Sequence, residues 1–235
     1  MGEIFELGIV IPVYNEENNI IALLNDWQKV FLTLQIQHRF FVVDDGSKDT
    51  SPALLASMSA EIPTLHILTR TNRGHGPSLL EGYKTASGAR WIFQIDGDHQ
   101  FETSAFPILW EKREQFDFLL AERGPEGATG FRNAISFCSR WVVNVFYGNP
   151  IKDVNSPYRL MRNDWVKEAL AIIPQGSFAP NLLLSSFFIA KKARIFTTHV
   201  NHHSQTLTKK SGLSPHILKG AVLALVQTLL FRFKI

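Results

Sequence analysis

The stretch 39-RFFVVDDGSKDTS-51 decides the fold class. Its apolar run, RFFVVDD, is typical of a strand, and the polar turn after it leads into a helix predicted from about Ser51. The run is apolar without alternation, which is the pattern of a strand that is covered on both faces. The stretch therefore predicts one β-α unit in a sheet that has helices on both sides.

The same unit recurs along the first half of the chain. Further strands are predicted at 7–14 (LGIVIPVY), 64–69 (TLHILT), 91–96 (WIFQID) and 117–121 (DFLLA), with helices over 16–34, over 77–86 and from about residue 104. Strands that alternate with helices indicate an α/β fold with a mostly parallel central sheet flanked by helices. Ligands of such sheets bind beyond the carboxyl ends of the strands, so the polar residues at these ends form the candidate site.

The second half has a different pattern. It predicts an apolar helix over 131–147, a loop at 148–160 (GNPIKDVNSPYRL), a helix at 180–190, a strand at 194–203, a polar link at 204–214 and a final helix from about 215 to 233. We find no internal repeat and no clear linker. The sequence therefore predicts one domain, residues 1–213, followed by a C-terminal amphipathic helix, residues 214–235.

Composition and charge narrow the class of protein. Of the 235 residues, 45% are hydrophobic and 19% are charged, which argues against a disordered chain. The net charge of +3 is too small to indicate nucleic-acid binding. From Lys191 onward there are eight Lys or Arg and no Asp or Glu, a tail suited to anionic lipid, nucleic acid or an anionic substrate. Nucleic acid is disfavoured because no aromatic motif is interleaved with the cations.

The sequence also bears on the compartment. The single cysteine, Cys138, rules out an internal disulfide and suits a reducing cytoplasm. The first residues carry acids where a secretion signal needs positive charge. The most apolar run, 220–231, has 12 residues, whereas a spanning helix needs about 20. We expect the final helix either to lie in a membrane interface, with its cations near anionic headgroups, or to pack on protein.

The motif DGD at 96–98 follows a predicted strand. An Asp-Gly turn and a metal site both fit it. An EF-hand does not, because the Gly and Glu required at its sixth and twelfth positions are missing. If the strand continues, Asp96, Asp98 and Gln100 face the same side and offer oxygens to a hard cation such as Mg²⁺.

Two other strand ends carry candidate ligand-binding residues. Asp44 and Asp45 can accept hydrogen bonds from a base or ribose, although Ser47 or Thr50 in the same stretch can also serve as a helix cap.

The segment 72-NRGHG-76 has Gly74 and Gly76 just before a helix. It lacks the third glycine of a dinucleotide fingerprint and the Gly-Lys-Ser/Thr of a phosphate loop. It is therefore either a turn whose backbone approaches a ligand or a plain loop.

These segments together resemble a known family. PVYNEE (12–17), VVDDGSKDTS (42–51), NRGHG (72–76) and DGD (96–98) resemble, in order and spacing, family 2 glycosyltransferases of the GT-A fold. The segments at 121–137 and 152–162 are similar to the branch that includes dolichyl-phosphate mannose synthases and bacterial polyprenyl-phosphate glycosyltransferases. The resemblance implies a GT-A nucleotide-diphospho-sugar transferase fold. It also implies inverting transfer of a sugar from a GDP- or UDP-sugar to a polyprenyl phosphate, by a cytoplasmic enzyme peripheral to the inner face of the membrane.

The resemblance implies a role for each matching residue. The residues expected to bind the nucleotide-sugar are Pro12, Tyr14, Glu16, Asp44, Asp45, Gly74, Gly76 and Asp96. Those expected to hold Mg²⁺ or Mn²⁺ are Asp96, Asp98 and Gln100. Arg123 and Arg132 match positions that meet the acceptor phosphate, and Asp153 and Arg159 match catalytic residues of the acceptor loop.

The sequence leaves several alternatives open. A phosphate acceptor is largely ionised at neutral pH, since its second pKa is about 6, so Asp153 would orient it; for a glycan hydroxyl Asp153 would be the candidate base. Arg132 and Arg159 can also be surface salt-bridge residues. A non-catalytic nucleotide-binding scaffold is the alternative from another class. The sugar, the base, the oligomeric state and any membrane-anchoring partner stay undetermined.

The sequence departs from the family pattern at three places. His75 and Pro77 stand where relatives often have Lys and Ala, which leaves donor selectivity open. Asn181 stands where many relatives have Glu, and the Arg that usually follows position 203 is missing. The acceptor side of the site is therefore expected to differ from that of the relatives.

Overall fold

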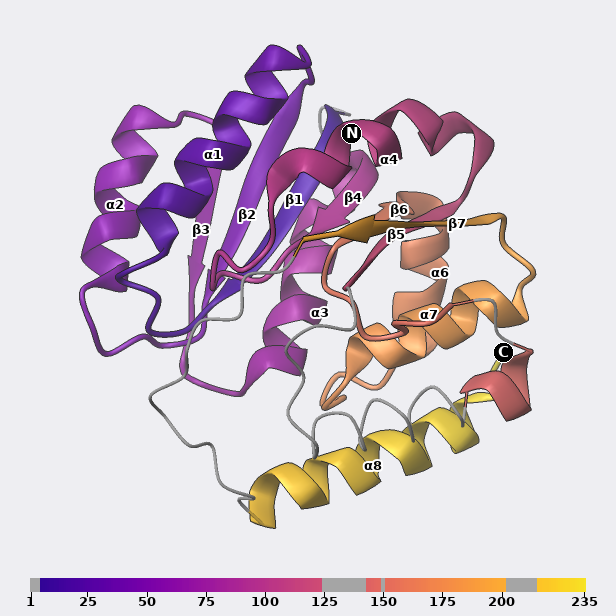
Figure 1. Cartoon of the computed structure of the whole chain (residues 1–235). Helices are drawn as coiled ribbons and strands as arrows, with labels where there is room; N and C mark the ends of the chain where they lie inside the picture. The colour runs from indigo at the N-terminus through magenta and orange to yellow at the C-terminus, as the bar shows by residue number, and fades with distance from the viewer. Residues whose placement is uncertain (1–4, 124–142, 149–150, 202–214) are drawn as a thin grey trace.

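The chain forms one seven-stranded sheet with helices on both faces (Figure 1). The computed structural model describes residues 5–123, 143–148, 151–201 and 215–235. The strands are β1 (Phe5–Val13), β2 (His38–Asp44), β3 (Leu65–Thr69), β4 (Ala89–Gln94), β5 (Phe118–Arg123), β6 (Arg159–Arg162) and β7 (Ile195–Val200). The helices are α1 (Ile20–Thr33), α2 (Ser51–Glu61), α3 (His75–Thr85), α4 (Phe106–Lys112), α6 (Asn163–Ile172), α7 (Pro180–Ala190) and α8 (Pro215–Phe231).

The strand order is β3-β2-β1-β4-β6-β5-β7. β1 pairs in parallel with β2 and β4, β2 with β3, and β5 with β7. Among the strands that the structure describes, only β6 is antiparallel to both of its neighbours, β4 and β5. The predicted α/β class with a mostly parallel sheet is therefore confirmed.

β6 was not predicted as a strand, and the predicted loop 148–160 ends inside it. The strand has only four residues, RLMR, and the arginines at its ends leave just two adjacent apolar residues as a strand signal. The predicted helix over 131–147 lies largely outside the described residues, of which 143–147 are helical.

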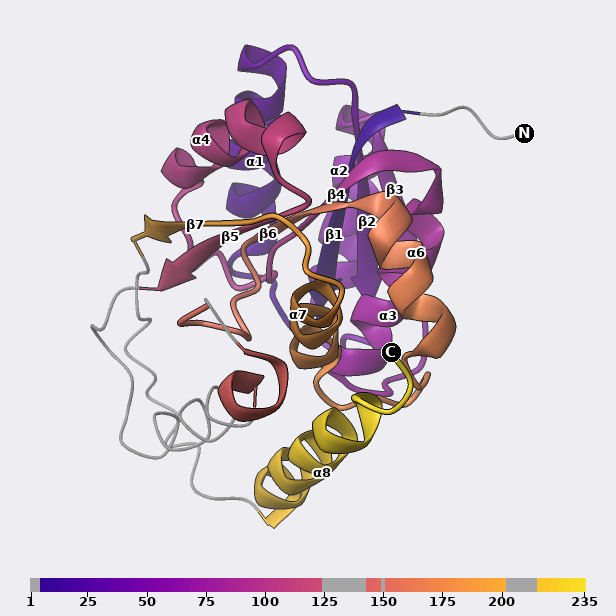
Figure 2. The ribbon, with the colours of Figure 1, turned by 90° about the vertical axis from the view of Figure 1, so that its right-hand side faces the viewer.

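Helices cover both faces of the sheet, as the two views together show (Figures 1 and 2), and an apolar core cluster lies on each side of it. Alternating residues of β1 serve both clusters: Leu7 and Ile9 point to the α1 side, and Val10 to the α3 side. On the α1 side the ring of Trp27 lies 4.9 Å from that of Phe93. Burying a side chain of this size contributes about 1.5–3 kcal/mol, so these clusters hold β1 and β4 rigidly in place.

The topology fixes where a ligand site can form. The crossovers through α1 and α2 carry the chain from β1 to β2 and β3, whereas α3 returns it to β4 on the other side of β1. The strand order thus reverses between β1 and β4. In open α/β sheets, ligands bind beyond the carboxyl ends of the strands at such a switch point.

Candidate active site

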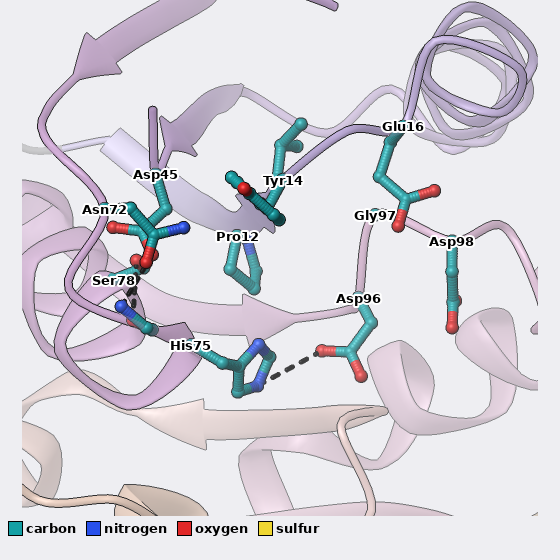
Figure 3. Close-up of a pocket in the computed structure, with 12 residues that line it drawn as sticks. Pro12, Tyr14, Glu16, Asp45, Asn72, His75, Ser78, Asp96, Gly97 and Asp98 are labelled. Carbon is teal, nitrogen blue, oxygen red and sulfur yellow. Dashed lines mark hydrogen bonds and ion pairs between the residues drawn. The ribbon is translucent and has the colours of Figure 1, made fainter. Parts of the chain in front are cut away.

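A pocket of about 260 Å³ lies at this switch point. It opens beyond the carboxyl ends of β1, β2 and β4, and the first turn of α3 forms one wall (Figure 3). It brings together seven of the residues predicted for the donor or the metal: Pro12, Tyr14, Glu16, Asp45, Gly74, Asp96 and Asp98.

The loops after β1 and β2 hold each other by hydrogen bonds. The N–H of Glu16 donates to Ser51 Oγ at 2.9 Å. In return, Thr50 donates to Glu17 Oε2 through its N–H at 2.9 Å and its hydroxyl at 2.6 Å. Thr50 stands at the N-cap of α2 but makes no side-chain cap, because its hydroxyl binds the neighbouring loop. The two motifs are therefore fastened to each other, which fixes the pocket rim.

Gly97 allows the turn after β4 to lie against β1. A Cβ at this position would lie 2.9 Å from Pro12 O, which is closer than real Cβ atoms come. β4 ends before this turn, so the strand alternation expected for Asp96 and Asp98 is wrong. The turn nevertheless places both residues in the pocket lining.

Three carboxylates crowd one side of the pocket (Figure 3). Burial raises the pKa of Glu16, and the charges of Asp49 and Asp96 add to this effect against the hydrogen bond from Asn19. Burial, the charge of Asp96 and, more weakly, that of Glu16 raise the pKa of Asp98 to about 6. The site therefore concentrates negative charge that a bound cation would relieve.

The residues present fit a divalent cation completed by phosphate oxygens. Among the described residues, the buried Asp96 Oδ1 has no hydrogen-bond partner, and His75 Nε2 lies 3.8 Å from it. Within the described ranges, no three His, Cys, Asp or Glu converge into a complete protein metal site. Magnesium usually takes one or two carboxylates together with substrate phosphates, which Asp96 and Asp98 can provide.

Asp45 is bound to the loop before α3. Its carboxylate accepts hydrogen bonds from the N–H groups of Arg73 at 3.0 Å and Gly74 at 2.7 Å. Arg70 Nε lies 3.1 Å from Asp45 Oδ1. Asp45 therefore positions the glycine loop on the pocket wall, besides lining the pocket itself.

Arg123 and Asp153 form a bidentate ion pair at the end of β5. Arg123 Nε and Nη2 donate to the Asp153 oxygens at 2.7 and 3.0 Å. Burial opposes the charge of Arg123, but the hydrogen bonds and charge of Asp153, with weaker contributions from Asp96 and Asp98, raise the pKa of the guanidinium. The pair therefore keeps Arg123 charged at the end of β5.

Arg159 lies inside the protein, and this corrects the expectation that it acts at the site. Its side chain is 0% exposed. Its guanidinium donates to the carbonyls of Val154, Ser156 and Asn181 at 2.6–3.2 Å. Burial lowers its pKa to about 10. Arg159 thus holds the loop 154–156 against α7 and reaches no pocket surface.

Other predicted residues lie near the pocket without lining it. Asp44 is 1% exposed and accepts the N–H of Ser47 at 2.9 Å, so it shapes the turn. The N–H of Gln100 donates to Asp98 Oδ1 at 3.3 Å. Gly76 is buried in α3, and the predicted phosphate contact of Arg132 falls outside the described residues.

Sequence reasoning missed part of the lining. The additional residues are Val13, Asn72, His75, Ser78 and Gly97. All of them lie within or beside the motifs at the strand ends, so their positions next to these motifs could have identified them as lining residues. The helix was predicted to start at residue 77, which obscured the role of its first turn. In the structure α3 begins at His75, and this first turn forms part of the pocket wall.

Comparison with protein families gives one model for most of the chain. The model "Glycosyl transferase family 2" matches residues 8–169. Undecaprenyl-phosphate 4-deoxy-4-formamido-L-arabinose transferase of Photorhabdus laumondii is 27% identical over 201 residues, which are 84% of this chain and 61% of that protein. The protein of the same name from Pseudomonas fluorescens is 28% identical over 77% of this chain and 54% of its own length. The chain thus spans little more than half of these curated relatives.

Solved structures show the same fold at low identity. S. aureus TarS in complex with UDP-GlcNAc matches with a TM-score of 0.64 and 17% identity, covering 96% of this chain and 66% of that one. Glucosyl-3-phosphoglycerate synthase from Mycobacterium tuberculosis, in complex with Mn²⁺, UDP and glucosyl-3-phosphoglycerate, matches with a TM-score of 0.66 and 15% identity, covering 98% and 81%. The expected GT-A architecture is confirmed.

Proposed function

Because the chain belongs to glycosyl transferase family 2, we propose that it is a metal-dependent, inverting glycosyltransferase. Its donor is a nucleotide-diphosphate sugar, and its acceptor is a polyprenyl phosphate. An oxygen of the acceptor phosphate forms a bond to the anomeric carbon of the sugar as the bond from that carbon to the diphosphate breaks.

The observation that carries this proposal is the acidic pocket at the switch point. Asp96 and Asp98 stand beside the first turn of α3, where Gly74 and His75 line the same wall. Glu16 and Tyr14 line the side formed by the loop after β1. We place the nucleotide base and ribose against this side, and the diphosphate beside Asp96 and Asp98. A bound Mg²⁺ or Mn²⁺ would neutralise the charge that develops on the leaving diphosphate.

Relatives support the choice of donor and acceptor. The Mycobacterium tuberculosis synthase carries Mn²⁺ and UDP in a chain of the same fold. The curated relatives act, by name, on undecaprenyl phosphate. The proposal extends both features to this chain.

Arg123 is the described cation best placed for the acceptor phosphate. Its fork suits two phosphate oxygens, and it stands at the end of β5 with its charge supported by Asp153. In the present arrangement Asp153 occupies this fork with both carboxylate oxygens. An acceptor phosphate would replace or share that carboxylate, so Asp153 orients Arg123.

The same ion pair favours a phosphate over a hydroxyl acceptor. A hydroxyl needs a base to take its proton, and Asp153 is the candidate. Both of its oxygens are engaged by Arg123, which opposes proton transfer to either one. A phosphate is largely ionised at neutral pH and needs no base.

A lipid acceptor requires a membrane-facing surface, and we assign it to the outer face of α8. Five of the twelve exposed large apolar side chains among the described residues lie on α8 or directly after it: Val222, Leu223, Val226, Leu230 and Phe233. Tyr147 joins the helical residues 143–147 to α8, since its hydroxyl donates to Thr228 O at 2.7 Å. Figures 1 and 2 show α8 along one end of the molecule.

The positive charge around this face favours an anionic bilayer as its binding partner. Arg232 and Lys234 are exposed at the end of the chain, and the sequence after Glu168 contains no Asp or Glu. Cations beside an apolar helix face favour anionic headgroups by about 1 kcal/mol each. None of the helices in the described ranges has the length and apolar character to cross a membrane. The division into a catalytic domain, residues 1–213, and an interfacial helix, residues 214–235, follows from this proposal.

Transfer to a lipid phosphate tests the function directly. The chain, with Mn²⁺ and each of UDP- and GDP-sugars, is assayed for sugar transfer to undecaprenyl phosphate and to a glycan hydroxyl acceptor. We expect transfer to the lipid phosphate, lost in Asp98→Asn and retained in the matched control Asp164→Asn, whose side chain is 81% exposed on α6. Nucleotide-sugar binding without transfer to either acceptor would favour the scaffold instead.

Flotation with vesicles tests the membrane face. Replacing Val222, Val226 and Leu230 by serine removes three exposed α8 side chains and should abolish flotation with phosphatidylglycerol vesicles. Leu32→Ser is the control, because Leu32 is 61% exposed on α1. Equal flotation of the triple variant and the control would refute the assignment of this face.

A further inference from the structure

The loop before α7 lies between the pocket wall and α8. Gly76, in the first turn of α3, packs so closely on this loop that a Cβ would overlap Ser177 O and lie 2.9 Å from Phe178 O. On the other side, a Cβ at Gly220 of α8 would lie 2.5 Å from the ring of Phe178. Gly76 and Gly220 thus allow both α3 and α8 to pack closely against Phe178.

Hydrogen bonds hold the loop together and join it to α3. The N–H and hydroxyl of Ser177 both donate to Pro174 O, at 3.0 and 2.8 Å. Gln175 Oε1 accepts a hydrogen bond from Lys84 Nζ at the far end of α3. The loop therefore contacts α3 at its first turn, through Gly76, and at its far end, through Lys84.

The first turn of α3 belongs to the pocket. His75, next to Gly76, lines it and lies 3.8 Å from Asp96. Gly74 and Ser78 line it as well. A continuous path of contacts thus runs from α8 through Phe178 and Gly76 to the residues beside the two metal-site aspartates.

We infer that Phe178 is a positioning residue that couples the bilayer-facing helix to the nucleotide pocket. Binding of α8 to an anionic surface restricts the helix, the ring of Phe178 and the first turn of α3 together. Nucleotide then binds a pocket whose wall is already ordered, which gives positive cooperativity between lipid surface and nucleotide. This inference rests on the proposed function, because it uses the proposed donor pocket and membrane face.

The test measures nucleotide affinity with and without vesicles. UDP and GDP, each with Mn²⁺, are titrated into the full chain alone, with phosphatidylcholine vesicles, and with vesicles of phosphatidylcholine and phosphatidylglycerol in equal parts. Coupling between sites is typically 5- to 150-fold, so we expect the anionic vesicles to lower the nucleotide Kd at least about fivefold. Reciprocity requires the nucleotide to tighten vesicle binding by the same factor.

Phe178→Ala should bind anionic vesicles and nucleotide separately while losing the vesicle effect on the nucleotide Kd. Phe146→Ala is the matched control: Phe146 is 43% exposed against 41% for Phe178, and the atoms that close on Gly76 and Gly220 belong to Ser177 and Phe178 instead. This control should keep the coupling. An unchanged Kd in the wild-type chain on bound vesicles, or full coupling in Phe178→Ala, would overturn the inference.

The two proposals fail differently in this experiment. A chain that binds neither nucleotide contradicts the proposed function. A chain that binds nucleotide and vesicles independently contradicts only the coupling. No sugar transfer is needed for either result.

Discussion

Asp98→Asn should stabilise the metal-free protein while removing its response to metal. The pKa of Asp98 is raised from 3.8 to about 6 by burial and by the charges of Asp96 and Glu16. The difference of about two units corresponds to about 3 kcal/mol at 1.36 kcal/mol per unit. Because the side chain is only partly buried, we expect about 1–3 kcal/mol in practice.

The sign follows from the protonation of the two states. The folded protein holds the Asp98 proton more tightly, so its stability falls as the pH rises through the window from 3.8 to about 6. Above this window the ionised carboxylate costs the folded state its full amount. Asparagine carries no charge at any pH, so the advantage of the variant is largest at pH 7.5 and shrinks toward pH 4.

The assay is thermal unfolding in chelator at pH 7.5 and pH 5. For a chain of 150–250 residues, 1 kcal/mol shifts Tm by about 2–4 °C, so the variant should melt about 2–12 °C above wild type at pH 7.5 and less far above it at pH 5. With Mn²⁺ and the nucleotide diphosphate the order should reverse, because only wild type gains binding energy. Asp164→Asn is the control. A variant no more stable than wild type in chelator at pH 7.5 would refute the electrostatic reasoning.

Three further predictions concern other parts of the site. Gly97→Ala should weaken nucleotide binding at least about tenfold by calorimetry, since its Cβ would meet Pro12 O at 2.9 Å and displace the turn; an unchanged Kd would contradict this. Arg159→Met should lower the free energy of unfolding in urea by about 2–4 kcal/mol, because it removes the buried hydrogen bonds from Arg159 to the carbonyls of Ser156, Asn181 and Val154; a loss below 1 kcal/mol would argue against an interior role. Arg123→Lys should raise the KM for polyprenyl phosphate and leave that for the nucleotide-sugar unchanged, because Lys lacks the two-oxygen fork; equal effects on both KM values would place the residue elsewhere.

The fold was largely predictable because its strands are apolar runs bounded by turn residues. The runs at 7–14, 39–45 and 64–69 each became a strand within two residues of the predicted bounds. β6 was not predictable, because four residues with charged ends carry almost no local signal and pair only through distant partners. The resemblance to family 2 glycosyltransferases is confirmed, since the family model covers residues 8–169.

The candidate site was predictable where topology alone brings residues together. Strand ends of a parallel sheet meet at one edge, which gathers Pro12, Asp45 and Asp96 without any knowledge of side-chain contacts. The environments of Arg123 and Arg159 depend instead on tertiary packing. An arginine in a sequence is expected at the surface, and only the folded chain shows that Arg159 is enclosed by carbonyl groups.

The position of β6 has a consequence for the order in which the chain can fold. The first 94 residues contain β1 to β4, which pair with one another in parallel and can assemble as soon as they are synthesised. β5 is made next, but its described partners are β6 and β7, both of which come much later in the chain. Until β6 and β7 have been synthesised, residues 118–123 therefore form an apolar segment without partner strands. We expect a ribosome-bound chain that stops before residue 159 to contain a folded half with strands β1 to β4. The rest of such a chain should be aggregation-prone and depend on chaperones.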